Sequence, residues 1–280
     1  MSGGVLITGA STGIGEATAL KLDQAGFRVF AGVRKPEDGE RLKAKASARL
    51  SVIQPLDVTD PDSIAKALAK VESELGGEPL RGIVNNAGIG SGGPLEAIDL
   101  DEFRQSLEVN TVGALAVTQA FLPLLRSSRG RIVNMSSIGG RLAQAFAGPY
   151  IASKFALEGV NDVLRRELIP WGIDVIAIEP GTIATPIWEK SSGKADELLA
   201  GMSREHRELY GKRAEKMAKV LARQTKRGAP PSKVADAVEH ALTAKRPRTR
   251  YLVGDAHLLI ALKWLLPTRL LDRLLYRATS

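Results

Sequence analysis

The sequence contains no cysteine. This absence excludes disulfide bonds, thiolate nucleophiles and metal sites built on cysteine. The three histidines, His206, His240 and His257, are too scattered along the chain to suggest a metal site. We therefore expect no bound metal, and we expect each histidine to be structural or exposed to solvent.

Long apolar runs are also missing. No segment reaches the roughly 18 consecutive apolar residues that a membrane-spanning helix needs, since Lys263, Pro267, Arg269 and Asp272 interrupt even the apolar tail. The first residues lead into the apolar run Val5 to Ile7 without a basic leader. We expect a cytoplasmic protein that can touch a membrane surface but does not cross the bilayer.

Charge is concentrated in one part of the chain. Residues 204–250 hold 14 Lys or Arg and five Asp or Glu, whereas the rest of the chain is nearly neutral, and the formal net charge is +8. A chain of 280 residues with 44% hydrophobic residues can bury one substantial core. We therefore expect a single domain over residues 1–280.

Short runs rich in Val and Ile alternate with stretches that favour helices. Their hydrophobicity is continuous, which is typical of parallel strands covered by helices on both faces. Asp60 and Pro61 mark the start of one intervening helix, and Gly76 marks its end. These repeated units predict an α/β fold, a doubly wound Rossmann-type parallel sheet. The expected strands are Val5–Ile7, Arg28–Val33, Leu50–Gln54, Gly82–Asn85, Arg131–Asn134, Ile173–Ile178 and Tyr251–Val253.

Two segments depart from this alternation. Residues 187–227 are charged and helix-forming, and they predict a helical lid inserted over the carboxyl edge of the sheet. Residues 256–280 form an apolar tail with leucines at helical spacing and Arg or Lys between them. The tail could cover the protein's own pocket, pack against a partner subunit, or lie with the basic region on an anionic membrane. We favour packing against protein.

A glycine-rich turn follows the first strand, Thr8-Gly9-Ala10-Ser11-Thr12-Gly13-Ile14-Gly15, and leads into a helix near Glu16. Such a turn presents backbone N–H groups and the positive end of a helix dipole to a pyrophosphate. Its spacing differs from the common G-x-G-x-x-G pattern. We therefore predict a dinucleotide site from the position of this turn, which lies between a strand and a helix.

The second strand ends at Val33-Arg34, where a site for NAD would place an acidic residue. A carboxylate there would repel a 2′-phosphate, whereas a guanidinium binds one through paired hydrogen bonds. Arg34 therefore predicts NADP(H) in preference to NAD(H).

Tyr150 and Lys154 lie four residues apart on an expected helix and so share one of its faces. Ser137 follows the strand Arg131–Asn134, whose carboxyl end borders the ligand crevice of such a sheet. A phenol with a pKa of about 10 needs a nearby positive charge to exchange protons near neutral pH. The three residues predict a site for proton transfer.

Taken together, these motifs resemble the short-chain dehydrogenase/reductase family over residues 3–255, and most of all its hydroxysteroid and retinol dehydrogenases and their bacterial relatives. The resemblance implies an oxidoreductase of alcohols and carbonyl compounds that uses a nicotinamide cofactor and forms a homodimer or homotetramer. The matching segments are the turn Thr8 to Gly15, Asn85-Asn86-Ala87-Gly88, Asn110, Ser137, Tyr150-x-x-x-Lys154 and Pro180-Gly181.

The resemblance also implies individual roles. Tyr150 exchanges a proton with the substrate oxygen, and Ser137 hydrogen-bonds that oxygen. Lys154 lowers the phenol pKa and holds the nicotinamide ribose, while Asn110 positions a water that links Lys154 to solvent. Further cofactor contacts are implied for Asp57 and Val58 at the adenine, Asn86, Ala87 and Gly88 at its ribose, and Pro180, Gly181, Ile183 and Thr185 at the nicotinamide.

Apolar residues border the expected substrate pocket, namely Leu142, Phe146, Ile187 and Trp188. They favour an apolar small molecule, such as a steroid- or retinoid-like alcohol or ketone. An alternative is a 3-oxoacyl-thioester reductase, whose acidic carrier or coenzyme A would meet the basic region. A remote alternative is a redox-sensing module that binds nucleic acid. The complete catalytic set argues against that reading, and we expect no nucleic-acid partner.

Overall fold

Seven parallel strands form one sheet in the order β3-β2-β1-β4-β5-β6-β7. The computed structural model describes residues 3–185 and 202–279. All seven strands expected from the sequence are present, with ends that differ by up to two residues. They are β1 (Gly4–Ile7), β2 (Arg28–Gly32), β3 (Leu50–Ile53), β4 (Leu80–Asn85), β5 (Arg131–Met135), β6 (Asp174–Pro180) and β7 (Arg250–Val253).

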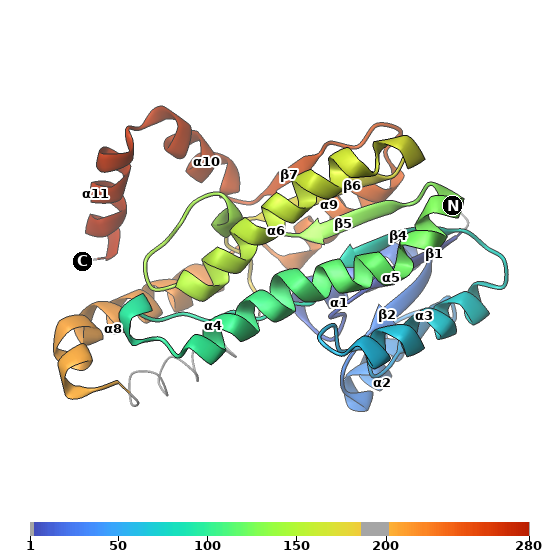
Figure 1. Ribbon diagram of the computed structural model, residues 1–280, viewed down its shortest axis with the longest axis horizontal. Coiled ribbons are helices and arrows are strands. Elements are labelled where there is room, and N and C mark those ends of the chain that lie inside the picture. The colour runs from blue at the N-terminus through green and yellow to red at the C-terminus, as the bar shows by residue number, and fades with distance from the viewer. Residues whose placement is uncertain (1–2, 186–201, 280) are drawn as a thin grey trace.

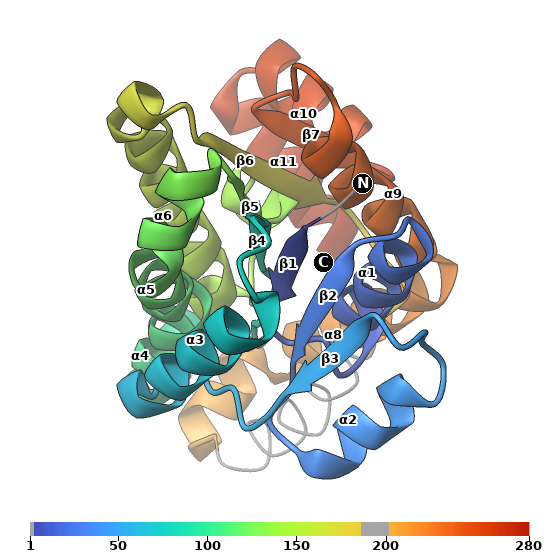
Figure 2. The same ribbon diagram turned by 90° about the vertical axis from the view of Figure 1, so that its right-hand side faces the viewer.

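Helices cover both faces of this sheet (Figure 2). On one face lie α1 (Gly13–Gln24), α2 (Pro36–Lys43) and α9 (Pro231–Thr243). On the other lie α3 (Pro61–Leu75), α4 (Leu100–Leu107), α5 (Gly113–Ser128) and α6 (Gly148–Glu167). The predicted doubly wound Rossmann-type fold is confirmed.

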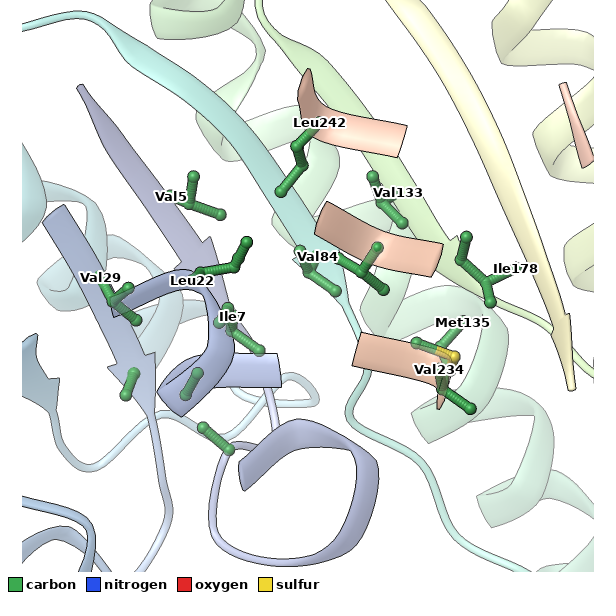
Figure 3. Close-up of a cluster of buried hydrophobic side chains, with 14 of the residues drawn as sticks. Val5, Ile7, Leu22, Val29, Val84, Val133, Met135, Ile178, Val234 and Leu242 are labelled. Atoms are coloured by element: carbon green, nitrogen blue, oxygen red, sulfur yellow. The ribbon is translucent and has the colours of Figure 1, made fainter. Parts of the chain in front are cut away.

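The core has two parts because successive strand residues face opposite sides of the sheet. Val5 and Ile7 of β1 pack with Leu22 of α1 and Val234 of α9 in one cluster (Figure 3). Leu6, between them, packs in the other cluster with residues of α3 and α5. Burial on both faces explains why the strand sequences are continuously apolar.

The helix predicted from Asp60 to Gly76 is present as α3. The Asp60 side chain accepts a hydrogen bond from the backbone N–H of Asp62 at 3.0 Å, and Pro61 occupies the first helical position. Gly76 ends the helix in the left-handed conformation, with φ of 57°. Local sequence signals are sufficient to define this element.

One continuous helical stretch among the described residues, Leu100–Ser128, is long and apolar enough to cross a membrane by length and composition alone. It comprises α4, the π-helical turn η2 (Glu108–Val112) and α5. Val117, Phe121 and Leu125 of α5 are fully buried, in the core cluster that also contains Leu6. Packing on the sheet accounts for the apolar character of these three positions.

Three helices gather beyond the carboxyl ends of the strands (Figure 1). They are α8 (Arg204–Arg227), α10 (Ala256–Leu265) and α11 (Thr268–Thr279). Of the predicted lid insertion, residues 204–227 form α8, and residues 187–201 lie outside the described residues.

The predicted tail forms the helix pair α10 and α11, and packing within the chain covers only part of it. Ala256 and Leu271 are buried. In contrast, Leu258, Trp264 and Leu265 are exposed by 65%, 74% and 78%. We expected the tail to pack against protein. Within this chain, only one side of the tail does so.

Candidate active site

One cavity of about 1460 Å³ lies at the carboxyl edge of the sheet. This edge includes the switch point between β1 and β4, where α/β sheets bind ligands. The cavity is lined by Ser137 and by all the residues expected at the cofactor except Asn110. The lining cofactor candidates are Gly9, Ser11, Thr12, Gly13, Ile14, Gly15, Arg34, Asp57, Val58, Asn86, Ala87, Gly88, Tyr150, Lys154, Pro180, Gly181, Ile183 and Thr185.

Hydrogen bonds join the glycine-rich turn to the end of β4. The Thr8 hydroxyl accepts from the backbone N–H groups of Asn86 and Ala87 at 3.0 and 2.9 Å. The Asn86 side chain donates to the carbonyl oxygens of Thr8 and Gly9, each at 3.0 Å. Glycine is required at Gly15 because a Cβ there would lie 2.2 Å from the Gly9 carbonyl oxygen. The turn is thus fixed before any ligand binds.

The turn fits the pyrophosphate of a dinucleotide. Gly13, Ile14 and Gly15 form the first turn of α1 and line the cavity. The first N–H groups of a helix have no partner within it, so they are available to phosphate oxygens. The Arg41 guanidinium on α2 donates to the Ser11 carbonyl and thereby supports the turn. Arg41 was not foreseen from the sequence because no motif marks it.

Arg34 lies exposed beyond the end of β2, at the expected adenosine end of the cavity. Hydrogen bonds from Thr59 hold the pKa of Asp57 below its usual value, and the positive charge of Arg34 contributes to the same shift. A carboxylate and a guanidinium therefore lie close together at this end. The arrangement places an exposed guanidinium on the cavity wall.

Tyr150 lies in the first turn of α6 and lines the cavity beside Ser137. Burial raises the pKa of the Tyr150 phenol, and a hydrogen bond with Ser137 lowers it. The Ser137 oxygen also accepts from the backbone N–H of Gly139 at 3.0 Å, which orients the hydroxyl. The two side chains can therefore reach the same substrate oxygen.

Lys154 lies one helical turn after Tyr150 on α6. Its Nζ is 5.7 Å from the centre of the Tyr150 ring and donates to the Met135 carbonyl at 2.7 Å. Burial lowers the pKa of Lys154 to about 8, and the negative charge of Glu158 opposes that shift. The lysine therefore remains mostly protonated at neutral pH, as a group that stabilises a phenolate must be.

A family profile described as short chain dehydrogenase matches residues 4–196. The chain belongs to the short-chain dehydrogenase family. It is an oxidoreductase of alcohols and carbonyl compounds that uses a nicotinamide cofactor and acts on small molecules.

Individual relatives of this short-chain dehydrogenase match over almost its whole length. Retinol dehydrogenase 5 of Mus musculus is 40% identical over 97% of this chain and 87% of its own length. An NADPH-dependent 3-dehydrocapnine reductase of Ornithobacterium rhinotracheale is 34% identical over 97% of this chain and 95% of its own. The crystal structure of a Burkholderia cenocepacia short chain dehydrogenase with NADP superposes with a TM-score of 0.74, at 26% identity, covering 98% and 97% of the two chains.

Asn110 of the dehydrogenase lies behind the cavity wall in the π-helical turn η2. Its side-chain amide donates to the Ile89 carbonyl and the Ser153 hydroxyl, each at 2.9 Å, and its oxygen accepts from the Ile89 N–H at 2.8 Å. Both amide hydrogens are thus used by protein groups. The water-positioning role that the resemblance implies for Asn110 stays a prediction.

The substrate side of the cavity only partly matches the sequence-based expectation. Leu142 lines it, whereas Phe146 is not among the lining residues, and Ile187 and Trp188 lie outside the described residues. The remaining wall comes partly from α8, α10 and α11. The lining residues of these helices are Arg213, Val220, Leu259, Asp272, Leu275 and Tyr276. Sequence motifs did not reveal them, although the apolar spacing of the tail was visible.

A charged network lies behind Lys154 in the dehydrogenase. Arg250 binds Glu158 at 3.0 Å, Asp162 at 2.6 Å and Glu179 at 2.9 Å, and Arg141 binds Glu179 at 3.1 Å. Burial raises the pKa of Glu179.

Within residues 3–185 and 202–279, no group of three or more His, Asp or Glu side chains is arranged to hold a metal ion.

Proposed function

We propose that the protein is an NADP(H)-dependent dehydrogenase/reductase that interconverts an apolar, steroid- or retinoid-like alcohol and its carbonyl form. The proposal rests on one observation above all. Ser137, Tyr150 and Lys154 line the same cavity as the glycine-rich turn. A dinucleotide on the turn and a substrate at Tyr150 would therefore share one cavity.

Tyr150 acts as the acid and base in this account. In reduction its hydroxyl donates a proton to the carbonyl oxygen, and in oxidation its phenolate accepts the alcohol proton. Because burial raises the pKa of the phenol, the phenolate needs compensation. The Lys154 ammonium supplies it. The Ser137 hydroxyl has one hydrogen to donate, so it supports the phenolate only until the substrate oxygen takes that hydrogen bond.

Ser137 donates a hydrogen bond to the reacting oxygen and stabilises the negative charge that develops there. The bound nicotinamide would supply or accept the hydride. Lys154 would hold the nicotinamide ribose through its Nζ. Nζ now donates to the Met135 carbonyl, and it would either give up that hydrogen bond or donate to the ribose with another of its hydrogens. Ile183 and Thr185 would hold the nicotinamide carboxamide.

Arg34 supports the preference for NADP(H) over NAD(H). The chain continues from β2 as Val33, Arg34 and Lys35, so the position of the expected acid is occupied by basic residues. The guanidinium would bind a 2′-phosphate in a charge-assisted pair. The relative named as an NADPH-dependent reductase and the solved neighbour with NADP agree with this choice.

The substrate class follows from the apolar part of the cavity wall. Leu142, Ile151, Val220, Leu259 and Leu275 contribute aliphatic surface to it. Such a wall binds a long or polycyclic hydrocarbon body by burying apolar area. The relative named retinol dehydrogenase carries the name of such an alcohol.

We further propose that the enzyme is a cytoplasmic homo-oligomer that contacts anionic membranes at their surface. Leu258, Trp264 and Leu265 present an apolar face on α10, and basic side chains are concentrated in residues 204–250. An apolar helix face in a chain that also has a cationic region is typical of a protein that binds at an anionic membrane surface. A partner subunit covering the same face is the competing outcome.

A 3-oxoacyl-thioester reductase remains the competing enzyme. The observation in its favour is that α8, which carries nine Lys or Arg and three Glu, borders the cavity and could meet the phosphates of coenzyme A or an acidic carrier.

A substrate panel tests the proposed function. Purified protein is mixed with NADPH or NADH and with a ketosteroid, a retinoid aldehyde or an acetoacetyl thioester, and loss of reduced cofactor is followed by absorbance. We expect turnover of the apolar ketone or aldehyde with NADPH. Turnover of the thioester alone would favour the reductase alternative, and equal use of both cofactors would contradict the role of Arg34.

A further inference from the structure

Arg213 of α8 lies between two aromatic rings on the wall of the active-site cavity. Its guanidinium carbon is 5.4 Å from the centre of the Phe146 ring and 4.7 Å from that of Tyr276. These rings come from the loop before α6 and from α11 (Figure 1). The arginine therefore joins three elements at the substrate end of the cavity.

The guanidinium is not fully satisfied by its neighbours. Its Nε is buried and has no hydrogen-bond acceptor among the described residues. Asp272 lines the same cavity, yet forms no ion pair with Arg213 in the described part of the chain. A buried charged donor without a hydrogen-bond acceptor lowers the stability of the fold, so such a group requires an explanation. Ring stacking uses the faces of the guanidinium plane. The terminal Nη groups, which are not among the buried atoms without a partner, remain for a ligand in the cavity.

Contacts with Gly92 and Gly93 hold the backbone of Phe146 in an unusual conformation. Phe146 has a φ of 63°, a left-handed backbone conformation that is strained and unusual for an aromatic residue. The Gly93 N–H donates to the Phe146 carbonyl at 2.8 Å, and a Cβ on Gly92 would approach that carbonyl oxygen to 2.4 Å. Strain of this kind persists only where the surroundings enforce it, and it clusters at functional sites.

The loop that carries Phe146 leads directly into α6, and Phe146 lies four residues before Tyr150. A short stretch of chain therefore joins the ring that Arg213 contacts to the acid/base. Aliphatic side chains on α8, α10 and α11, namely Val220, Leu259 and Leu275, line the same cavity. A cation at one place and a proton donor at another, within one partly apolar cavity, match a substrate that is polar at both ends.

We propose that Arg213 forms a subsite for an anionic group, such as a carboxylate, at the end of the substrate remote from the reacting carbon. The inference deepens the proposed function and rests on it for the identity of the reacting end. The planar N–H edge would bind the carboxylate through two hydrogen bonds, and the apolar wall would cover the hydrocarbon between. A neutral alcohol of the same length would gain only the apolar contacts.

Binding can be measured without turnover. The full-length protein is titrated calorimetrically with decanoate and with 1-decanol, as wild type, as Arg213→Met and as Lys212→Met, the control that removes an exposed neighbouring charge. We expect Arg213→Met to weaken decanoate by about tenfold or more, the scale of one charge-assisted pair, and to leave 1-decanol nearly unchanged. Lys212→Met should change neither ligand more than twofold.

A second variant separates ligand binding from a structural clamp. Arg213→Lys keeps the charge but loses the paired donors, so its decanoate affinity should fall between wild type and Arg213→Met while its melting temperature stays close to that of the wild type. Equal losses for decanoate and 1-decanol in every Arg213 variant would overturn the proposal and leave the arginine as a clamp between α8 and α11.

Kinetics distinguish this inference from the proposed function. A long-chain keto acid and the methyl ketone that lacks its carboxylate are compared as substrates with NADPH. We expect Arg213→Met to raise KM for the keto acid by about tenfold, with kcat and the methyl ketone little changed. If the wild type binds decanoate through Arg213 but reduces neither ketone, the proposed function fails and the anion subsite stands. If it reduces both with equal KM, the subsite fails and the function stands.

Discussion

The Glu158 carboxylate lies one helical turn beyond Lys154 on α6. Burial lowers the pKa of Lys154, and the negative charge of Glu158 limits that shift, so that the pKa is about 8. Its Oε1 is buried without a hydrogen-bond partner among the described residues, while Oε2 binds Arg250 at 3.0 Å. Glu158 is therefore a positioning residue that acts on the proton-transfer site through its charge.

Replacing Glu158 by Gln should move the pH dependence of the reaction. The substitution removes the negative charge that supports the Lys154 ammonium, so the pKa of Lys154 falls further below its usual value. Since a lysine with a lower pKa loses its proton at lower pH, kcat should begin to fall at a lower pH in the variant. The measurement is kcat against pH with saturating NADPH and substrate across the neutral and alkaline range.

Asp162→Asn is the matched control for Glu158→Gln. Asp162 also binds Arg250, at 2.6 Å, but its charge is not among the causes of the Lys154 shift. Either variant leaves Arg250 two carboxylate partners, including Glu179. A shift of equal size in both variants would mean that the network supports the helix only, and Glu158 would lose the role assigned to it.

Lys154→Met should damage two properties together. The variant keeps the side-chain volume but deletes the ammonium that faces Tyr150 and that would hold the nicotinamide ribose. We expect kcat to fall by about 100-fold or more, the scale of one acid/base contribution, and NADPH to dissociate more readily. Fluorescence titration with NADPH reports the second effect, and an unchanged affinity would show that the lysine does not hold the ribose.

The fold was more predictable than the site because its signals are local. The N-cap at Asp60, the left-handed Gly76 and the apolar β1 each depend on neighbours a few residues away. The motif residues Tyr150 and Lys154 were placed correctly on one helix for the same reason.

What the sequence could not provide are contacts between distant segments. The Asn110 amide binds Ile89 and Ser153, which lie 21 and 43 residues away. Arg250 reaches Glu158 across 92 residues. Nothing in the local pattern distinguishes Arg213 from the other basic residues of α8, and only the packing of Phe146 and Tyr276 around it does so.

Arg34→Ala tests the cofactor preference. Loss of the guanidinium should weaken NADPH by about 1.5 to 3 kcal/mol, the scale of a charge-assisted hydrogen bond, while NADH, which lacks the 2′-phosphate, should change much less. Dissociation constants for both cofactors are measured by fluorescence titration. Equal losses for the two would show that Arg34 does not bind the phosphate.

The double variant Trp264→Ser, Leu265→Ser tests the membrane contact. These side chains are 74% and 78% exposed, so the substitutions should leave folding intact. We expect the wild type to co-sediment with anionic vesicles at low salt and less at high salt, and the variant to remain in the supernatant. Leu100→Ser, at another site that is 63% exposed, is the control. If instead the variant loses its oligomeric state and no protein binds vesicles, the face belongs to a subunit interface.

The measurement that bears most directly on the central claim is turnover by Tyr150→Phe. The substitution deletes the hydroxyl and little volume, so NADPH affinity and melting temperature should stay close to those of the wild type. Steady-state reduction of the best substrate from the panel should fall by at least about 100-fold, because the proton donor is gone. Activity within threefold of the wild type would contradict the assignment of Tyr150 as the acid and base.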